Sequence, residues 1–208
     1  MEILPLSYLG NIQYFSKLCF DDCVIDVCEN YVKQSFRTRA DILSANGLIS
    51  LSVQVAKPAG PRCPVREMRL DYSKRWQHQH WVSLVSAYRS SPYFDYYEEA
   101  LAPFYRRRYE FLLDYDVELT RTLLRLLGSD AELRFTESYA LPEPGDRDWR
   151  TALSPKQRDR KPDSGFAARP YCQVFGDKFG FVENLSVVDL IFCEGPDSLQ
   201  HLKSCRLG

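Results

Sequence analysis

Residues 49–55 read Ile-Ser-Leu-Ser-Val-Gln-Val, and this is the clearest structural pattern in the chain. Apolar and polar side chains alternate, with the period of two that a half-buried β-strand requires. An Asn-Gly turn signal stands just before it. Upstream, residues 31–39 alternate in the same way, with Lys33, Arg37 and Arg39 on one face. We therefore predict two strands, at 31–39 and at 49–55.

The period of the pattern changes farther along the chain. Residues 68–72 alternate once more and predict a short strand. After them, Trp81, Leu84, Val85 and Tyr88 recur at the spacing of one helical face. An amphipathic helix is therefore predicted here.

A long helical region should follow. Ser91 is a candidate N-cap and Pro92 fits the first helical position, so we expect a new helix to begin there. Pro103 must end or kink that helix, because its ring removes a donor and clashes with the preceding turn. Helically spaced apolar residues then run over 104–127, and Gly128 suits the stop.

The two ends of the chain add shorter elements. We predict a helical face at 15–19 and a buried strand at 24–25. Later, residues 133–141 alternate like a strand, 171–181 look extended, and 186–192 look like a short helix with Asn184 or Ser186 as its N-cap. The order predicts a mixed α/β fold, with N-terminal strands, a central helical segment and a C-terminal return of strand and helix.

Residues 142–168 lack apolar periodicity and are rich in proline, glycine and basic residues. A connection of about 25 residues is longer than most, and such segments are functional or mobile. We predict a mobile loop at 142–168 inside a single compact domain that spans 1–208. Its basic part, 146–161, is expected to close over the site as a lid.

The composition is that of an ordinary globular protein: 27 Lys and Arg balance 28 Asp and Glu, for a net charge of −1. This balance argues against a nucleic-acid partner. No apolar stretch approaches the roughly 20 residues of a membrane span, and we expect no secretory signal. An odd count of seven cysteines then favours free thiols. We predict a cytoplasmic protein without a membrane span.

The basic stretch is the first candidate site. On one face of a strand, Lys33, Arg37 and Arg39 would lie roughly 7 Å apart, and guanidinium groups bind carboxylate or phosphate bidentately. Acidic and aromatic neighbours support a site: Asp26, Glu29 and Tyr31. The alternative is a solvated edge strand that uses its charges to prevent pairing.

Two histidines, His78 and His80, are candidates for a general base, because histidine titrates near neutral pH. Alternatively, one of them packs or caps at the helix start, or the two bind a metal ion. No Cys or carboxylate stands beside them at ligand spacing, and Cys19, Cys23 and Cys28 are expected in the core. We therefore predict no metal site.

Aromatic residues, most of them tyrosines, are dense between residues 88 and 115. Most should pack between helices, although Tyr93 or Tyr96 could stack on a sugar or a base. The run Arg106-Arg107-Arg108 is interpreted as a solvated face. The chain contains no GxGxxG, P-loop, GxSxG or HExxH motif. The sequence therefore identifies no particular cofactor.

Taken in order, several segments resemble the WbqC-like protein family, and together they cover nearly the whole chain. These segments are residues 8–15, 22–26, 31–39 and 47–55, the region of Trp76 and His80, Tyr88 with residues 92–94, and residues 185–192. The family's opening carries a His or Gln before a Pro, and a Pro-Trp pair after the Tyr, where this chain has Leu4 and Gly10-Asn11. Its members are similar to proteins encoded in bacterial surface-polysaccharide gene clusters. The resemblance implies work on an activated sugar or another small-molecule donor.

We therefore predict a transferase-type enzyme that acts on a small anionic or nucleotide-linked substrate in surface-glycan biosynthesis. The predicted catalytic residues are His80, Asp26 and Glu29. The predicted substrate-binding residues are Asn11, Gln13, Tyr31, Lys33, Arg37, Arg39 and Tyr93. The alternative is a non-catalytic scaffold that uses its Tyr-rich helices as a protein interface.

Overall fold

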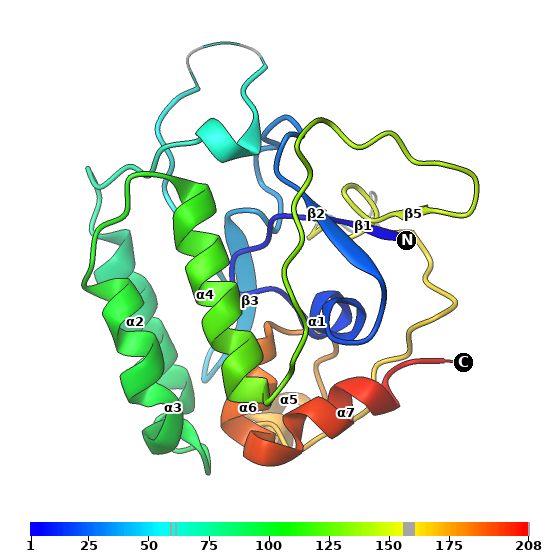
Figure 1. The fold of residues 1–208 in the computed structure, drawn as a ribbon. Coiled ribbons are helices and arrows are strands. Elements are labelled where there is room, and N and C mark those ends of the chain that lie inside the picture. Colours follow the sequence, from blue (N-terminus) through cyan, green and yellow to red (C-terminus); the bar gives the residue numbers. More distant parts are fainter. Residues whose placement is uncertain (59, 61, 156–160, 208) are drawn as a thin grey trace.

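A three-stranded parallel sheet organises the N-terminal part of the computed structural model (Figure 1). The structure describes residues 1–58, 60, 62–155 and 161–207. In the sheet, β1 (Glu2–Pro5) lies between β2 (Cys23–Asp26) and β5 (Arg147–Asp148). All four residues of β1 are buried, as expected for the central strand of a parallel sheet. The register pairs Pro5 with Asp26, so β2 ends in an acidic residue beside the end of β1.

An antiparallel hairpin forms the second sheet. It pairs β3 (Arg39–Ser44) with β4 (Gly47–Ser52), and the register sets Arg39 opposite Ser52. Gly47 has φ +103°, which glycine tolerates and which closes the turn. The predicted strand at 49–55 is thus confirmed as far as Ser52, and beyond it only Val55 makes an isolated bridge, to Leu70.

The strand predicted at 31–39 is wrong, because residues 31–38 form a loop and only Arg39 enters β3. Gln34 has φ +57°, which breaks the extended backbone. The stretch alternates in sequence, but no neighbouring strand pairs with it. Instead, the amide of Tyr8 donates to the carbonyl of Phe36 at 2.9 Å and holds the loop against the core.

Helices surround the two sheets. The main ones are α1 (Ile12–Leu18), α2 (Trp76–Tyr88), α3 (Phe94–Leu101), α4 (Leu112–Leu127), α5 (Gly176–Phe179), α6 (Val187–Glu194) and α7 (Ser198–Ser204). Short 3₁₀ turns cover Val65–Glu67, Ala102–Tyr105 and Gly195–Asp197. In Figure 1, α2, α3 and α4 lie to one side of β3, and α1 lies to the other. The mixed α/β class and the single compact domain are as predicted.

Several predicted helix signals are confirmed and one is wrong. Gly128 ends α4 in the left-handed conformation, and Ser186 caps α6 through its hydroxyl oxygen. Pro103 is the second residue of the 3₁₀ turn that directly follows α3, so the α-helix ends just before this helix-breaking ring. Ser91 is not an N-cap, since its hydroxyl donates to the Tyr88 carbonyl at 2.6 Å and closes α2 instead.

Three further predictions of extended structure are also wrong. Residues 133–141 contribute only a bridge between Phe135 and Ile25, and 68–72 only isolated bridges. Residues 171–181 contain α5 rather than a strand. The alternating stretches 68–72 and 133–141 lack a partner strand long enough to build a ladder, and a strand needs such a partner to satisfy its backbone.

Residues 142–168 are structured in part. They contain β5, followed by Trp149, which is buried and whose indole N–H donates to Glu2. Asp163 forms a buried ion pair with Lys17 at 2.6 Å. Residues 156–160 of the predicted lid lie outside the described residues, and the mobility of the segment stays a prediction.

Candidate functional site

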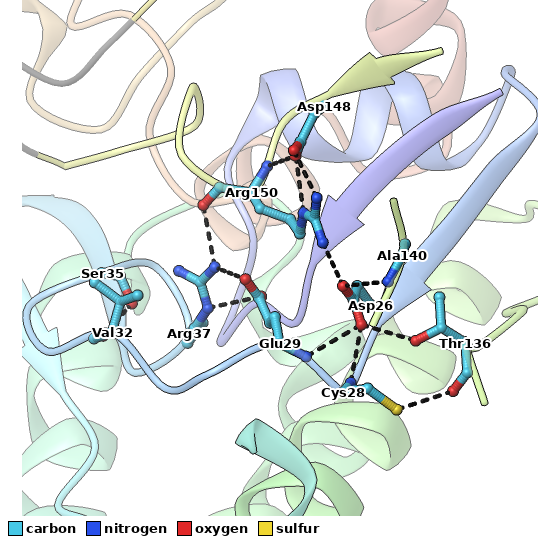
Figure 2. Close-up of polar contacts among 10 residues, drawn as sticks. All are labelled: Asp26, Cys28, Glu29, Val32, Ser35, Arg37, Thr136, Ala140, Asp148 and Arg150. Atoms are coloured by element: carbon cyan, nitrogen blue, oxygen red, sulfur yellow. Dashed lines mark hydrogen bonds and ion pairs between the residues drawn. The ribbon is translucent and has the colours of Figure 1, made fainter. Parts of the chain in front are cut away.

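A buried network of ion pairs gathers three of the predicted site residues (Figure 2). Arg37 binds Glu29 with two donors, its Nε donating to Oε1 at 2.8 Å and its Nη2 donating to Oε2. The same guanidinium donates to the Arg150 carbonyl at 3.0 Å. Arg150 in turn donates to Asp26 at 2.5 Å, and both its Nε and its Nη2 donate to the Asp148 carboxylate. Two arginines thus join the end of β2, the following loop and the segment after β5.

Asp26 is the most enclosed member of this network, with no exposed surface. Besides Arg150 it accepts hydrogen bonds from four donors: the backbone amides of Cys28, Glu29 and Ala140 and the hydroxyl of Thr136. The donors that surround this carboxylate stabilise its negative charge within the core. The bonds to Cys28 and Glu29 also turn the chain directly after β2.

Burial raises the pKa of Glu29, and the facing Arg37 opposes that rise. The hydrogen bonds that Arg150 donates to the Asp148 carboxylate raise the pKa of Arg150, so this cation stays charged. Glu29, Arg37 and Arg150 are each no more than 5% exposed. Because Asp26, Glu29, Arg37 and Arg150 are buried and every charge in the network is paired, we interpret the network as a support for the loop it closes.

That loop borders an open pocket of about 480 Å³, which we call the hairpin pocket because it lies along the ends of β3 and β4. Its lining includes Tyr31, Lys33, Gln34, Thr38, Arg39, Ser52, Gln54, Lys57 and Asp71. Three of the predicted substrate-binding residues therefore meet there, although the predicted strand does not form. Arg37 points the other way, into the buried network.

The hairpin pocket is rich in positive charge. Lys33, Arg39 and Lys57 line it, and Asp71 is the one carboxylate among the described residues of its lining. None of the three cations forms an ion pair with a carboxylate in the described part of the chain. Asp71 accepts hydrogen bonds from the amide and hydroxyl of Ser73 at 2.8 and 2.9 Å, which lower its pKa. The pocket can therefore bind an anion and accept a hydroxyl hydrogen bond.

His80 lies in the core and does not line the hairpin pocket. Its Nδ1 is 2.8 Å from the Tyr8 hydroxyl, which is 3.2 Å from that of Tyr105. Burial lowers the pKa of His80 to about 4, and a hydrogen bond to the Ser52 backbone opposes the shift. His80 is therefore neutral at pH 7 and lies directly behind Ser52, which does line the pocket.

The remaining predicted residues lie elsewhere. Asn11 caps α1 by accepting from the Tyr14 amide at 2.8 Å, and Gln13 donates to Asp163 at 2.8 Å. Asn11 and Gln13 border a cavity of only about 40 Å³, which has room for little more than water. The half-buried ring of Tyr93 lies against Gly195. The structure does not bring these three residues to the hairpin pocket.

Sequence reasoning missed Lys57 and Asp71. Lys57 follows the strand at 49–55 almost directly and precedes Pro58, and Asp71 lies within the predicted strand 68–72. The sequence signal for Lys57 is a cation two residues after a strongly alternating stretch. Asp71 became a lining residue because its amide donates to the Gln54 carbonyl at 2.9 Å, a contact that no local pattern encodes.

Seven free thiols are present, of which Cys23, Cys193 and Cys205 are buried and Cys172 is exposed. Burial raises the pKa of Cys23 to about 12, so that thiol stays protonated. Within residues 1–58, 60, 62–155 and 161–207, no group of three His, Cys, Asp or Glu side chains could hold a metal ion. Over the same ranges, no helix has both the length and the apolar character to cross a bilayer.

Comparison with known proteins places the chain in a family. The chain is 24% identical to an uncharacterized Mycobacterium tuberculosis protein, Rv1507c, over 99% of its own length and 98% of the relative's. No solved structure matches the chain. A family model described as WbqC-like protein family matches residues 7–179, which include the buried network and the hairpin pocket. The chain belongs to the WbqC-like protein family.

Proposed function

We propose that the chain is a transferase-type enzyme that binds a small anionic or nucleotide-linked substrate in the hairpin pocket. The observation that carries the proposal is the set of three cations without ion-pair partners among the described residues, Lys33, Arg39 and Lys57, on one pocket. The chain as a whole has a net charge of −1, so this local excess does not follow from composition. A pocket lined by one sign of charge concentrates ligands of the other.

Each lining residue has a role in this proposal. Lys33, Arg39 and Lys57 hold the phosphate or carboxylate group of the substrate. Tyr31 offers a ring for a base or a sugar, and its hydroxyl lies 3.4 Å from that of Thr38, which orients the ring. The ionised Asp71 accepts a hydrogen bond from a substrate hydroxyl.

The enclosed residues are assigned as positioning residues. The ion pair of Glu29 with Arg37 closes the loop that carries Tyr31 and Lys33. Asp26 fixes the start of that loop through two backbone amides. His80 supports the pocket wall through the backbone of Ser52. These groups act on the substrate through the residues that they hold in place.

Two broader features support the assignment. The family resemblance to proteins of surface-polysaccharide clusters supports a substrate that carries an activated sugar. Seven free thiols suit a reducing compartment, and we propose a cytoplasmic location on that ground.

The scaffold alternative receives less support. Most of the aromatic rings between residues 88 and 115 are buried: Tyr88, Phe94, Phe104, Tyr105, Tyr109 and Tyr115. Tyr96 is 79% exposed, but a single exposed ring does not make an apolar interface. The Tyr-rich helices therefore serve mainly as core.

A thermal-shift panel of nucleotides, nucleotide-sugars, sugar phosphates and small carboxylates tests the binding step. A ligand at 100 times its Kd stabilises by about 2.7 kcal/mol, which is about 5–11 °C for a chain of this length. We expect Lys33→Gln/Arg39→Gln to abolish the shift. The matched control Arg89→Gln/Lys203→Gln removes two exposed positive charges elsewhere and should leave the shift intact.

Mass spectrometry of ligand mixtures then tests the reaction. Every binding ligand is incubated in pairs with the others, and a new product that wild-type protein makes and Lys33→Gln/Arg39→Gln does not would support a transferase. A shift that is equal in both double variants places the ligand outside the hairpin pocket and contradicts the proposal. Binding without any product in all pairs favours a binding protein.

A further inference from the structure

A second pocket rich in positive charge lies at the start of α2, on the other side of the segment that carries Asp71. This α2 pocket has a volume of about 220 Å³. Its lining includes Lys74 and Arg75 before α2, and Arg106 and Arg108 from the loop between the Ala102–Tyr105 turn and α4. Among the residues that the structure describes, no Asp or Glu lines it. None of the four cations forms an ion pair with a carboxylate among the described residues.

Hydrogen bonds hold the two walls of the α2 pocket together. The side chain of Gln77, in the first turn of α2, donates to the carbonyls of Phe104 and Arg107 at 2.8 and 2.6 Å. The Tyr72 hydroxyl donates to the Tyr109 carbonyl at 3.0 Å and accepts from its amide at 2.9 Å. The backbone of the arginine loop is thereby fixed against α2.

One arginine is also oriented by an aromatic ring. The guanidinium of Arg108 lies 5.1 Å from the centre of the Tyr72 ring, in a cation–π contact. Arg107, between the two pocket arginines, lies over the Tyr109 ring instead and forms an ion pair with Glu118 at 3.4 Å. The run of three arginines is therefore divided, with one paired on the surface and two facing the α2 pocket.

Four like charges around one pocket repel one another, and an anion is the ligand that relieves the repulsion. The volume is below that of pockets that take drug-sized molecules, so it suits a phosphoryl or diphosphate group rather than a whole nucleotide. Guanidinium groups match the geometry of phosphate oxygens. The α2 helix also begins at this pocket without a side-chain cap, which leaves backbone N–H groups available to the same anion.

The two pockets are joined through the chain. Asp71 lines the hairpin pocket and the next residue, Tyr72, lines the α2 pocket. Their common segment is anchored, because the Trp76 indole donates to the Asp71 carbonyl at 3.0 Å. A transferase needs one place for a donor and another for an acceptor. We propose that the α2 pocket binds the phosphate group of the second substrate, an inference that rests on the proposed function for its partner pocket.

Calorimetric titration of the full chain with inorganic pyrophosphate at low ionic strength tests the inference. Wild-type protein should bind at two sites. Arg106→Gln/Arg108→Gln should weaken one site by at least about tenfold, the worth of one hydrogen bond to a charged group, and leave the other. Lys33→Gln/Arg39→Gln should show the reverse. The control is again Arg89→Gln/Lys203→Gln. Circular dichroism checks that all three double variants fold.

The outcomes separate the two proposals. If Arg106→Gln/Arg108→Gln keeps both sites, the α2 pocket is not a phosphate site, whatever Lys33→Gln/Arg39→Gln shows. If that variant loses a site while Lys33→Gln/Arg39→Gln binds like wild type, phosphate binding at the α2 pocket stands and the proposed function fails. An equal loss in the control means that net charge alone drives binding, which overturns the inference. Tighter binding of a single-stranded oligonucleotide, lost in the same arginine variant, overturns it in favour of nucleic acid.

Discussion

Glu29 and Arg37 lie eight residues apart in the chain and meet as a buried two-point ion pair at the base of one loop. The residues between them carry the exposed Lys33 and the half-buried Tyr31 to the hairpin pocket. A shielded pair thus fixes the geometry of a solvent-facing site. The pair explains how a loop without regular structure can present charges in a defined arrangement.

Arg37→Ala should destabilise the fold by about 3–5 kcal/mol, because it leaves the Glu29 carboxylate buried without its cation. Urea unfolding measures the change. Lys33→Ala, in the same loop but exposed, is the control and should stay within about 0.5 kcal/mol of wild type. In a double-mutant cycle, Glu29→Gln should cost less in the Arg37→Ala background than alone. An Arg37→Ala variant as stable as wild type would show that the pair does not support the loop.

Asp116 gives the protein a stability that falls with rising pH. Its carboxyl is fully buried and accepts no hydrogen bond within the described part of the chain. Burial raises its folded pKa well above the usual value. The folded state therefore holds its proton more tightly than the unfolded state. The stability from this proton is complete below the unfolded pKa, about 3.9, and is lost as pH rises through the folded pKa.

Asp116→Asn removes that ionisation. We expect the Asn variant to be more stable than wild type at neutral pH, with an advantage that shrinks toward pH about 4. Thermal unfolding across this range is the measurement. Asp114→Asn, exposed on the same helix, serves as the matched control. A variant that is less stable than wild type throughout would contradict the prediction.

His80 should act in the opposite direction. Burial lowers its folded pKa to about 4, below the unfolded value of about 6.5. The unfolded chain binds the proton first, so this contribution to stability is complete above pH about 6.5 and is lost as pH falls toward about 4. It amounts to on the order of 3 kcal/mol.

The unfolding free energy of wild type and His80→Gln, followed between pH about 4 and about 7, checks this. The variant should show the shallower acid dependence, whereas His78→Gln, at an exposed position on the same helix, should follow wild type. Parallel curves for wild type and His80→Gln would mean that His80 binds a proton in the folded state as readily as in the unfolded state.

Gly195 accommodates the ring of Tyr93. A Cβ at position 195 would lie 2.5 Å from Cδ1 of that ring, and the backbone has φ +54°. Gly195→Ala should therefore destabilise by about 1–3 kcal/mol, through overpacking and strain together. Gly47→Ala separates the two causes, since Gly47 also has positive φ but nothing within 4 Å of the added atom. Equal losses at both positions in thermal unfolding would leave no role for the contact with Tyr93.

Local physics determined much of the fold. The alternation in β4, the helical spacing in α2, the Gly128 stop and the Ser186 cap could each be predicted from the sequence, because each depends on residues within a few positions of one another. The stretches 31–39 and 133–141 alternate as well as β4 does. They are not strands, because a strand also needs a partner, and partners are assigned by tertiary structure.

The candidate site divides in the same way. The sequence by itself determined that Tyr31, Lys33, Arg37 and Arg39 lie in one short polar stretch, from which we predicted an anion site. Only the tertiary structure decided that Arg37 points into the core, because its two acceptors, Glu29 and the Arg150 carbonyl, lie there. The tertiary structure also brought Lys57 and Asp71 from other segments to the hairpin pocket, which Tyr31, Lys33 and Arg39 line. The direction of a charged side chain depends on which partners the fold places within reach, and residues far apart in the chain supply those partners.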